Sequence, residues 1–250
     1  MDEEAGFLRA LIEQPDEPAH RLVYADWLDD HGEAYRAHLI RAQLALSRAL
    51  RAPEGPFDPI GSLDVNDLEE TLRERLLRPL EPLWENWPGV PRSILRPEVG
   101  VPHPTVAFSF AVRGGLVEQV HLRSGIALRR FTEHVGGLCE RVPIRDVRIW
   151  PGPRWFSDGN GVLQEDGVTH EEIGNFLEQP AVADLRVIDV SNFDWRGNEV
   201  ILPGFSVKRA TVRLHVAGWG LPSEEITQRL QARFGARLVI EPPHDIEIPF

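Results

Sequence analysis

The 250-residue sequence contains a single cysteine, Cys139, and a single lysine, Lys208. One cysteine excludes an internal disulfide and a zinc site built from several thiolates, and we interpret it as a buried structural thiol. The chain contains no run of 18 apolar residues, and its acidic first residues, Met-Asp-Glu-Glu-Ala-Gly-Phe, lack the apolar segment of a secretory signal. We therefore expect a cytoplasmic protein that does not enter a membrane.

Positive charge is also scarce. Lys and Arg number 27 against 39 Asp and Glu, which leaves a formal net charge of −12 at pH 7. Such a chain repels phosphate backbones, and its arginines are too scattered to offset this repulsion. We expect no direct contact with nucleic acid. An accessory subunit that reaches nucleic acid only through its partners stays open as an alternative.

The motifs of common catalytic and nucleotide-binding sites are missing. The sequence has no G-x-S-x-G elbow, no H-E-x-x-H pair and no G-x-x-x-x-G-K-[ST] loop. Its densest acidic cluster is Asp26, Asp29 and Asp30 with His31. Asp26 and Asp30 lie one helical turn apart, but a hard cation normally needs more oxygen ligands than two carboxylates supply. The sequence thus predicts no enzyme, no metal and no cofactor; a metal-assisted hydrolase that uses Asp26 and Asp30 is the alternative, and aspartates paired with arginines on a solvated helix face are the simpler interpretation.

Helical periodicity predicts a helical module over residues 1–78. A first helix ends at Pro15, a second runs from about Pro18 to a stop at Gly32, and a third covers roughly residues 33–50. A fourth helix is expected through Leu68–Leu77. The predicted core of the module consists of the apolar residues on the inner helix faces: Phe7, Leu11, Leu22, Trp27, Leu28, Ile40 and Leu44.

Two neighbouring stretches are distinctive: Arg21-Leu-Val-Tyr-Ala-Asp-Trp-Leu-Asp-Asp-His-Gly32 and Glu33-Ala-Tyr-Arg-Ala-His-Leu-Ile-Arg-Ala-Gln-Leu-Ala-Leu46. Together they resemble the N-terminal module of bacterial repeat-companion domain proteins, over about residues 3–48. The sequence departs from the usual wording at Asp29-Asp30-His31 and at His38. The resemblance implies that leucine-rich or similar repeats follow the module, and it brings no catalytic residues.

After the module, residues 79–105 hold seven prolines and are predicted to be a linker. Residues 106–250 then show an L-x-x-L-x-L spacing in which short strands alternate with helical segments. The middle apolar positions of successive copies lie 27, 41, 26 and 24 residues apart, with an insertion at 151–167 in the long interval. These positions are Val120, Val147, Ile188, Leu214 and Leu238. The spacing predicts an α/β fold in which a short, degenerate leucine-rich-repeat-like solenoid with a parallel sheet follows the helical module; a compact α/β domain with irregular crossovers is the alternative.

In each copy, the residue between the last two apolar positions points away from the core because side chains alternate across a strand. Stacking of the strands would align these residues into a polar stripe, with Trp150 just beyond the strand end as an aromatic anchor. The stripe is predicted to bind another protein, and a solvated sheet surface without a partner is the alternative. The predicted binding residues are His121, Arg148, Trp150, Asp189 and His215.

Overall fold

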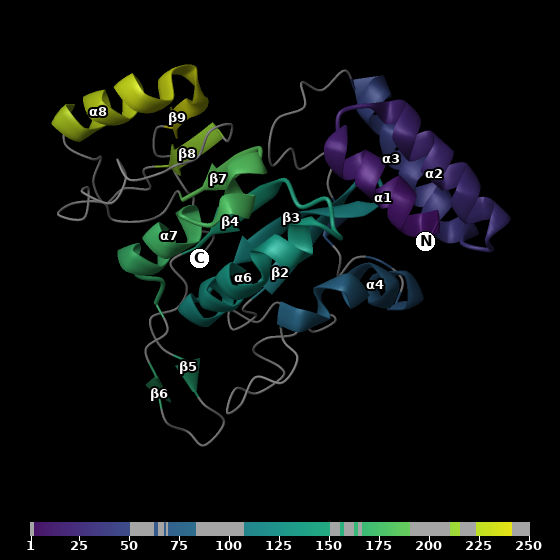
Figure 1. Ribbon diagram of the computed structural model, residues 1–250, viewed down its shortest axis with the longest axis horizontal. Helices are drawn as coiled ribbons and strands as arrows, with labels where there is room; N and C mark the ends of the chain where they lie inside the picture. The colour runs from purple at the N-terminus through teal and green to yellow at the C-terminus, as the bar shows by residue number, and fades with distance from the viewer. Residues whose placement is uncertain are drawn as a thin grey trace, which may run out of the picture.

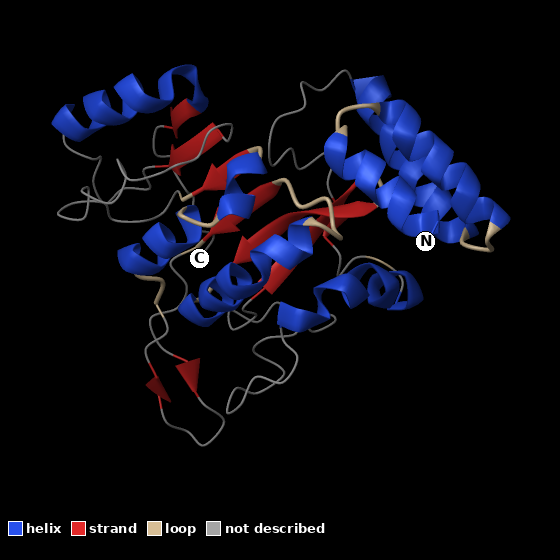
Figure 2. Ribbon diagram, viewed as in Figure 1, coloured by secondary structure: helices blue, strands red, loops and turns tan. Residues whose placement is uncertain are grey.

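The computed structural model describes residues 3–50, 63–64, 68, 70–83, 108–150, 156–157, 163–164, 167–190, 211–215 and 224–241. The fold belongs to the α/β class, as the sequence predicts (Figure 1, Figure 2). Three N-terminal helices lie at one end of a sheet, and further helices lie against the sheet (Figure 1). Within the described ranges, no helix combines the length and the apolar composition that crossing a bilayer requires.

The N-terminal helices are α1 (Glu3–Glu13), α2 (Pro18–Asp30) and α3 (Ala34–Leu50). Their ends follow local chemistry: Pro18 occupies the first turn of α2, and Gly32, with a φ of 80°, allows the turn into α3. The three predicted helices are confirmed. Their shared core, called here the module cluster, does not include Leu22, which is half-buried. It consists of Leu11, Tyr24, Ala25, Leu28, Ala37, Ile40 and Leu116, with Phe7, Leu8, Trp27 and Leu44 partly buried against them.

The main sheet contains, among the described residues, seven strands in the order β1-β2-β3-β4-β7-β8-β9. The strands β1, β2 and β3 are antiparallel neighbours, and every pair from β3 to β9 is parallel. Strand β2 was not predicted from the sequence. A separate two-stranded pair, β5 (Phe156–Ser157) with β6 (Leu163–Gln164), forms within the predicted insertion. The strands of the main sheet are β1 (Leu63–Asp64), β2 (Phe108–Arg113), β3 (Leu116–Leu122), β4 (Asp146–Ile149), β7 (Val187–Asp189), β8 (Thr211–His215) and β9 (Leu238–Glu241).

Helices follow the parallel strands along the chain. They are α6 (Gly125–Cys139), α7 (His170–Leu177) with the 3-10 helix η3 (Pro180–Asp184), and α8 (Glu224–Phe234) with the 3-10 helix η5 (Gly235–Arg237). Helix α7 begins with a capping box, because Thr169 Oγ1 accepts from the Glu172 backbone N–H while the Glu172 side chain accepts from the Thr169 N–H. In Figure 1, α6 and α7 lie side by side against the sheet.

Helix α4 (Glu70–Leu77) and the 3-10 helix η2 (Arg78–Leu83) pack with the sheet and α6. Their five leucines, Leu72, Leu76, Leu77, Leu80 and Leu83, join the strand and helix residues of one large core, called here the sheet cluster. The assignment of residues 79–83 to a linker is therefore wrong, since Leu80 and Leu83 are fully buried. Residues 84–107, the rest of the predicted linker, lie outside the described part of the chain.

The hairpin between β2 and β3 joins the two clusters. Gly114 and Gly115 form its two-residue loop, and both have positive φ (54° and 76°), as a tight hairpin turn requires. A Cβ on Gly115 would lie 2.1 Å from Cγ1 of Ile40 in α3, so the loop backbone touches the helix directly. Gln43 forms two hydrogen bonds with the same turn: its Nε2 donates to the Val112 carbonyl at 2.9 Å, and its Oε1 accepts from the Gly115 N–H at 2.6 Å.

Arg21 of α2 completes this junction. Its guanidinium forms a buried ion pair with Glu118 of β3 and donates to the carbonyl oxygens of Gly114 (3.3 Å) and Pro15 (3.2 Å). The side chains of Arg21 and Glu118 are only 7% and 1% exposed. Two polar side chains, Arg21 of α2 and Gln43 of α3, therefore attach the N-terminal helices to the sheet.

Candidate functional site

The strand register brings three of the predicted binding residues together. His121 of β3 lies beside Arg148 of β4, and Arg148 lies beside Asp189 of β7. Their neighbours along each strand belong to the sheet cluster, so the three side chains project to the opposite face of the sheet. Arg148 Nε donates to Asp189 Oδ2 at 2.8 Å, which joins the second and third members of the row.

The prediction that His215 is the fourth member of the row is wrong. Arg213 of β8 lies beside Asp189, whereas His215 lies two residues farther along and pairs with Glu241 of β9. The sequence spacing had aligned Leu214 with Ile188, but the register aligns Val212 with Ile188. By strand register, the row therefore runs His121, Arg148, Asp189 and then the position of Arg213.

The sequence predicted that this row would be an exposed polar stripe, but the row is largely buried. Asp189 is 2% exposed, and His121 and Arg148 are only partly exposed. Burial, helped by the nearby cations of Arg148 and Arg123, lowers the pKa of His121 to about 4, so the imidazole is neutral at pH 7. The Arg148–Asp189 pair follows from the same burial, because a buried carboxylate needs a charge partner.

A second polar row lies on the same face, two residues earlier on each strand, and it was not predicted from the sequence. Gln119 lies beside Asp146, which is completely buried, and Asp146 lies beside Val187. The Arg186 guanidinium donates two hydrogen bonds, of 3.1 and 2.7 Å, to the Asp146 carboxylate. Burial alone would lower the pKa of Arg186, but the bonds to Asp146 outweigh it and the pKa is raised. These groups neutralise one another and serve the stability of the sheet.

Among the residues of the predicted face whose burial is described, the exposed ones lie at the carboxyl ends of the strands. Trp150 follows β4 and is 44% exposed, although its backbone N–H still donates to the Leu122 carbonyl at 2.7 Å. This bond extends the β3–β4 ladder by one hydrogen bond, so the Trp150 side chain points to the same face of the sheet as that of Arg148, two residues earlier. Arg123, just after β3, is also exposed. Trp150 and Arg123, with the partly exposed Arg148, are called here the strand-end patch.

Two aspartates of the acidic cluster of α2 bind an arginine of the neighbouring helix. Arg41 of α3 donates to Asp26 at 2.6 Å and to Asp29 at 2.5 Å, and these bonds raise the pKa of the guanidinium. Among the described residues, no three His, Cys, Asp or Glu side chains are grouped in a way that could hold a metal ion. One carboxylate of the Asp26/Asp30 pair is therefore engaged by an arginine that joins α2 to α3.

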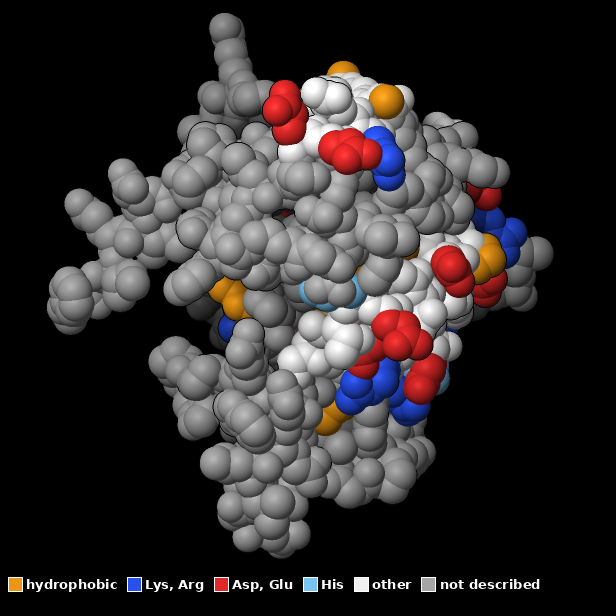
Figure 3. Space-filling view, turned by 90° about the vertical axis from the view of Figure 1, so that its left-hand side faces the viewer, with side chains coloured by type: hydrophobic (Ala, Val, Ile, Leu, Met, Phe, Trp, Pro, Cys, Tyr) orange, Lys and Arg blue, Asp and Glu red, His pale blue; other side chains and the backbone are white. Residues whose placement is uncertain are grey.

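Ion pairs also organise the surface elsewhere. Arg129 of α6 pairs with Glu172 of α7, and Arg229 pairs with Glu225 within α8 at 2.6 Å. Figure 3 shows acidic and basic side chains lying beside one another on the face that it presents. On that face, the described charged residues are thus mixed in sign and form no broad acidic patch, despite the net charge of the chain.

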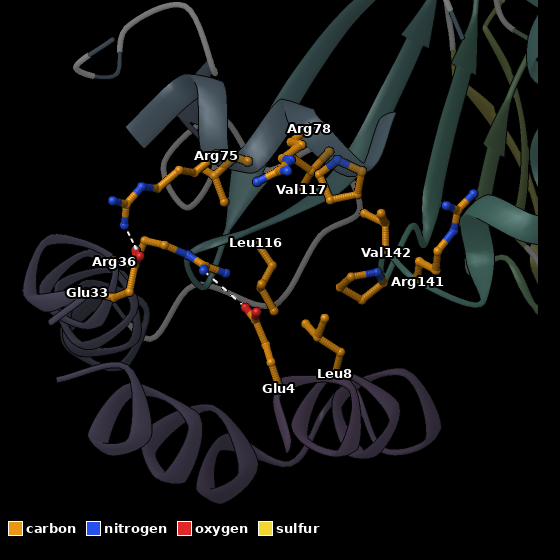
Figure 4. Close-up of a pocket in the computed structure, with 13 residues that line it drawn as sticks. Glu4, Leu8, Glu33, Arg36, Arg75, Arg78, Leu116, Val117, Arg141 and Val142 are labelled. Carbon is orange, nitrogen blue, oxygen red and sulfur yellow. Dashed lines mark hydrogen bonds and ion pairs between the residues drawn. The ribbon is translucent and has the colours of Figure 1, made fainter. Parts of the chain in front are cut away.

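Among the described residues, two cavities of several hundred Å³ lie between the N-terminal helices and the sheet, besides a minor one of about 50 Å³ at Arg21. The smaller, about 440 Å³, is lined by residues of α1, α3, α4, η2, β3 and the turn after α6 (Figure 4). The larger, about 840 Å³, lies between the end of α1, the end of α6 and η3. Arg141 and Pro143 line both, so the turn between α6 and β4 separates them. Sequence reasoning found neither cavity, because their walls come from segments that are distant in the chain.

No protein-family model, curated protein or solved structure matches this chain. Its function is therefore argued from the arrangement of its own residues.

Proposed function

We propose that this protein is a non-catalytic interaction protein, an accessory subunit that binds another protein through the strand-end patch. The observation that carries the proposal is the exposure of Trp150 at the carboxyl edge of the sheet, where the exposed Arg123 directly follows the neighbouring strand. Trp and Arg are the residue types that contribute most binding energy at protein interfaces. A large apolar side chain that is 44% exposed near the exposed cation of Arg123 suits a partner segment that is both apolar and acidic.

We further propose that the sheet is a short leucine-rich-repeat-like solenoid behind a repeat-companion module. Two features support this architecture. Each parallel strand from β3 to β9 pairs with the next strand of the main sheet along the chain, and the apolar positions Val120, Val147, Ile188, Val212 and Leu238 lie in register. Solenoids of this type bind partners along the sheet rather than within a catalytic pocket. Because the polar rows in the middle of the sheet are buried, we propose that binding occurs at the strand ends.

The test is affinity capture from the native host with the full-length protein, followed by mass spectrometry. Trp150→Ala removes the anchor, and Tyr35→Ala, an aromatic residue of α3 that is 75% exposed, is the matched control. We expect a protein that the wild type and Tyr35→Ala capture equally, and that Trp150→Ala loses, with both variants melting near the wild-type temperature. Equal capture by all three proteins would place the interface elsewhere.

A further inference from the structure

The smaller cavity has a composition that is unusual for this acidic chain. Four arginines and two glutamates line it, a formal local charge of +2 in a protein whose net charge is −12. Its remaining wall is apolar and comes from several separate segments. The apolar lining residues are Leu8, Leu76, Pro79, Leu116, Val117, Val142 and Pro143.

Two of the four arginines are neutralised within the cavity wall. Arg36 donates to Glu4 at 3.1 Å and to the Tyr24 hydroxyl at 2.6 Å, and its guanidinium lies 5.6 Å from the centre of the Tyr24 ring. Arg75 forms an ion pair with Glu33. These contacts hold Glu4, Arg36 and Glu33 in fixed positions on one side of the cavity (Figure 4).

The other two, Arg78 and Arg141, have no ion pair with any carboxylate of the described residues. Arg78 extends from η2 beside Val117, across the view from Glu4 and Leu8 (Figure 4). Arg141 turns away at the rim, where its Nε donates to the Gly137 carbonyl at 2.9 Å. Arg78, which is exposed, is therefore an uncompensated cation on the wall of the cavity, and Arg141 is a second one at its rim.

We propose that this cavity binds a small organic anion, a phosphate or carboxylate carried on a compact apolar body. A guanidinium matches both anions with two parallel N–H donors, which favours Arg78 as the group that receives the charge. The apolar wall of Leu116, Val117 and Val142 would receive the body of the ligand. A cavity of about 440 Å³ falls within the size range of small-molecule sites.

Because the lining spans both the N-terminal helices and the sheet, a bound anion bridges the two. A ligand that binds the folded state but not the unfolded chain raises the melting temperature as its concentration increases. Binding is therefore measurable as thermal stabilisation of the whole chain, independently of any partner protein.

The experiment measures binding to the full-length protein at low ionic strength by calorimetry and by thermal melting. The probes are inorganic phosphate, citrate and phenyl phosphate, so that the anion and the apolar body are varied separately. Phenyl phosphate is expected to bind more tightly than inorganic phosphate, because only the organic anion contacts the apolar wall. Citrate, which binds through its carboxylates, distinguishes a carboxylate site from a phosphate site.

Arg78→Gln is expected to weaken phenyl phosphate binding about tenfold, since it removes a charge-assisted hydrogen bond. Arg141→Gln, at the rim, should have a smaller effect. Arg229→Gln, an exposed position on α8 far along the chain, is the matched control and should bind as the wild type does. All three side chains are exposed or at a rim, so the unliganded variants should melt near the wild-type temperature.

The proposal is overturned if none of the three anions binds at about 10 mM, a concentration that would detect even a very weak site. It is also overturned if Arg78→Gln and Arg229→Gln weaken binding equally, which would indicate general attraction to arginines. Equal affinity for phenyl phosphate and inorganic phosphate would contradict the apolar part of the site.

Discussion

The buried pair between Arg21 and Glu118 leads to the strongest prediction about stability. Arg21→Met keeps the length of the side chain but removes the charge and every donor. The Glu118 carboxylate, 1% exposed, then loses its partner, and its second oxygen, Oε2, already lacks a hydrogen bond among the described residues. Breaking a buried pair on one side costs about 3–5 kcal/mol, because the remaining charge stays desolvated. We expect the free energy of unfolding to fall by that amount.

A double variant separates the charge effect from packing. Arg21→Met combined with Glu118→Leu removes both charges, so the desolvated carboxylate no longer exists. Stability should recover to within about 2 kcal/mol of the wild type. The remaining deficit reflects the carbonyls of Pro15 and Gly114, which lose a donor at about 1 kcal/mol each.

The assay is urea unfolding of the full chain, followed by circular dichroism. Arg129→Met is the matched control, because the Arg129 side chain is 48% exposed and its pair with Glu172 should contribute only about 0–1 kcal/mol. Equal losses in Arg21→Met and Arg129→Met would refute the reasoning. So would a double variant that is less stable than Arg21→Met alone.

Three further predictions concern single positions. Gly115→Ala should lower the free energy of unfolding by at least about 2 kcal/mol, measured by thermal melting, because the new Cβ meets Ile40 and a positive φ is unfavourable for alanine. Since the pKa of His121 is about 4 when folded and 6.5 when unfolded, the unfolded chain takes up the proton first as pH falls. Stability should therefore decline by up to about 3 kcal/mol between pH 6.5 and 4, and His121→Asn should flatten this decline; an unchanged pH profile would contradict it. Thr169→Ala should cost about 1 kcal/mol, because it removes the hydrogen bond that its side chain accepts from the Glu172 N–H; hydrogen exchange at the start of α7 reports the loss.

Local chemistry was sufficient to predict most helices. Pro18, Gly32 and the pair Thr169…Glu172 mark helix ends within a few residues of the positions that they control, so no distant contact is needed to interpret them. The apolar positions Val120, Val147 and Ile188 were also predicted correctly, since alternation along one strand shows which side chains face the core.

A Gly-Gly pair between two apolar runs is itself a hairpin signal, and it would have revealed β2 from the sequence. The antiparallel edge of the sheet, β1 and β2, was not predicted. The contacts of Gly114 and Gly115 with the N-terminal helices could not be predicted from the sequence. Arg21 and Gly114 are separated by more than ninety residues, and only the folded chain brings them together.

Sequence alone determined the fold class, the three N-terminal helices and three members of the row on the sheet. The tertiary structure decided the rest of the candidate site. Register depends on hydrogen bonds between strands, and a shift of two residues keeps the same face toward the core, so periodicity could not distinguish Arg213 from His215. Burial of Asp189 and the cavity around Arg78 depend on several segments meeting in space, and no pattern along one segment records that meeting.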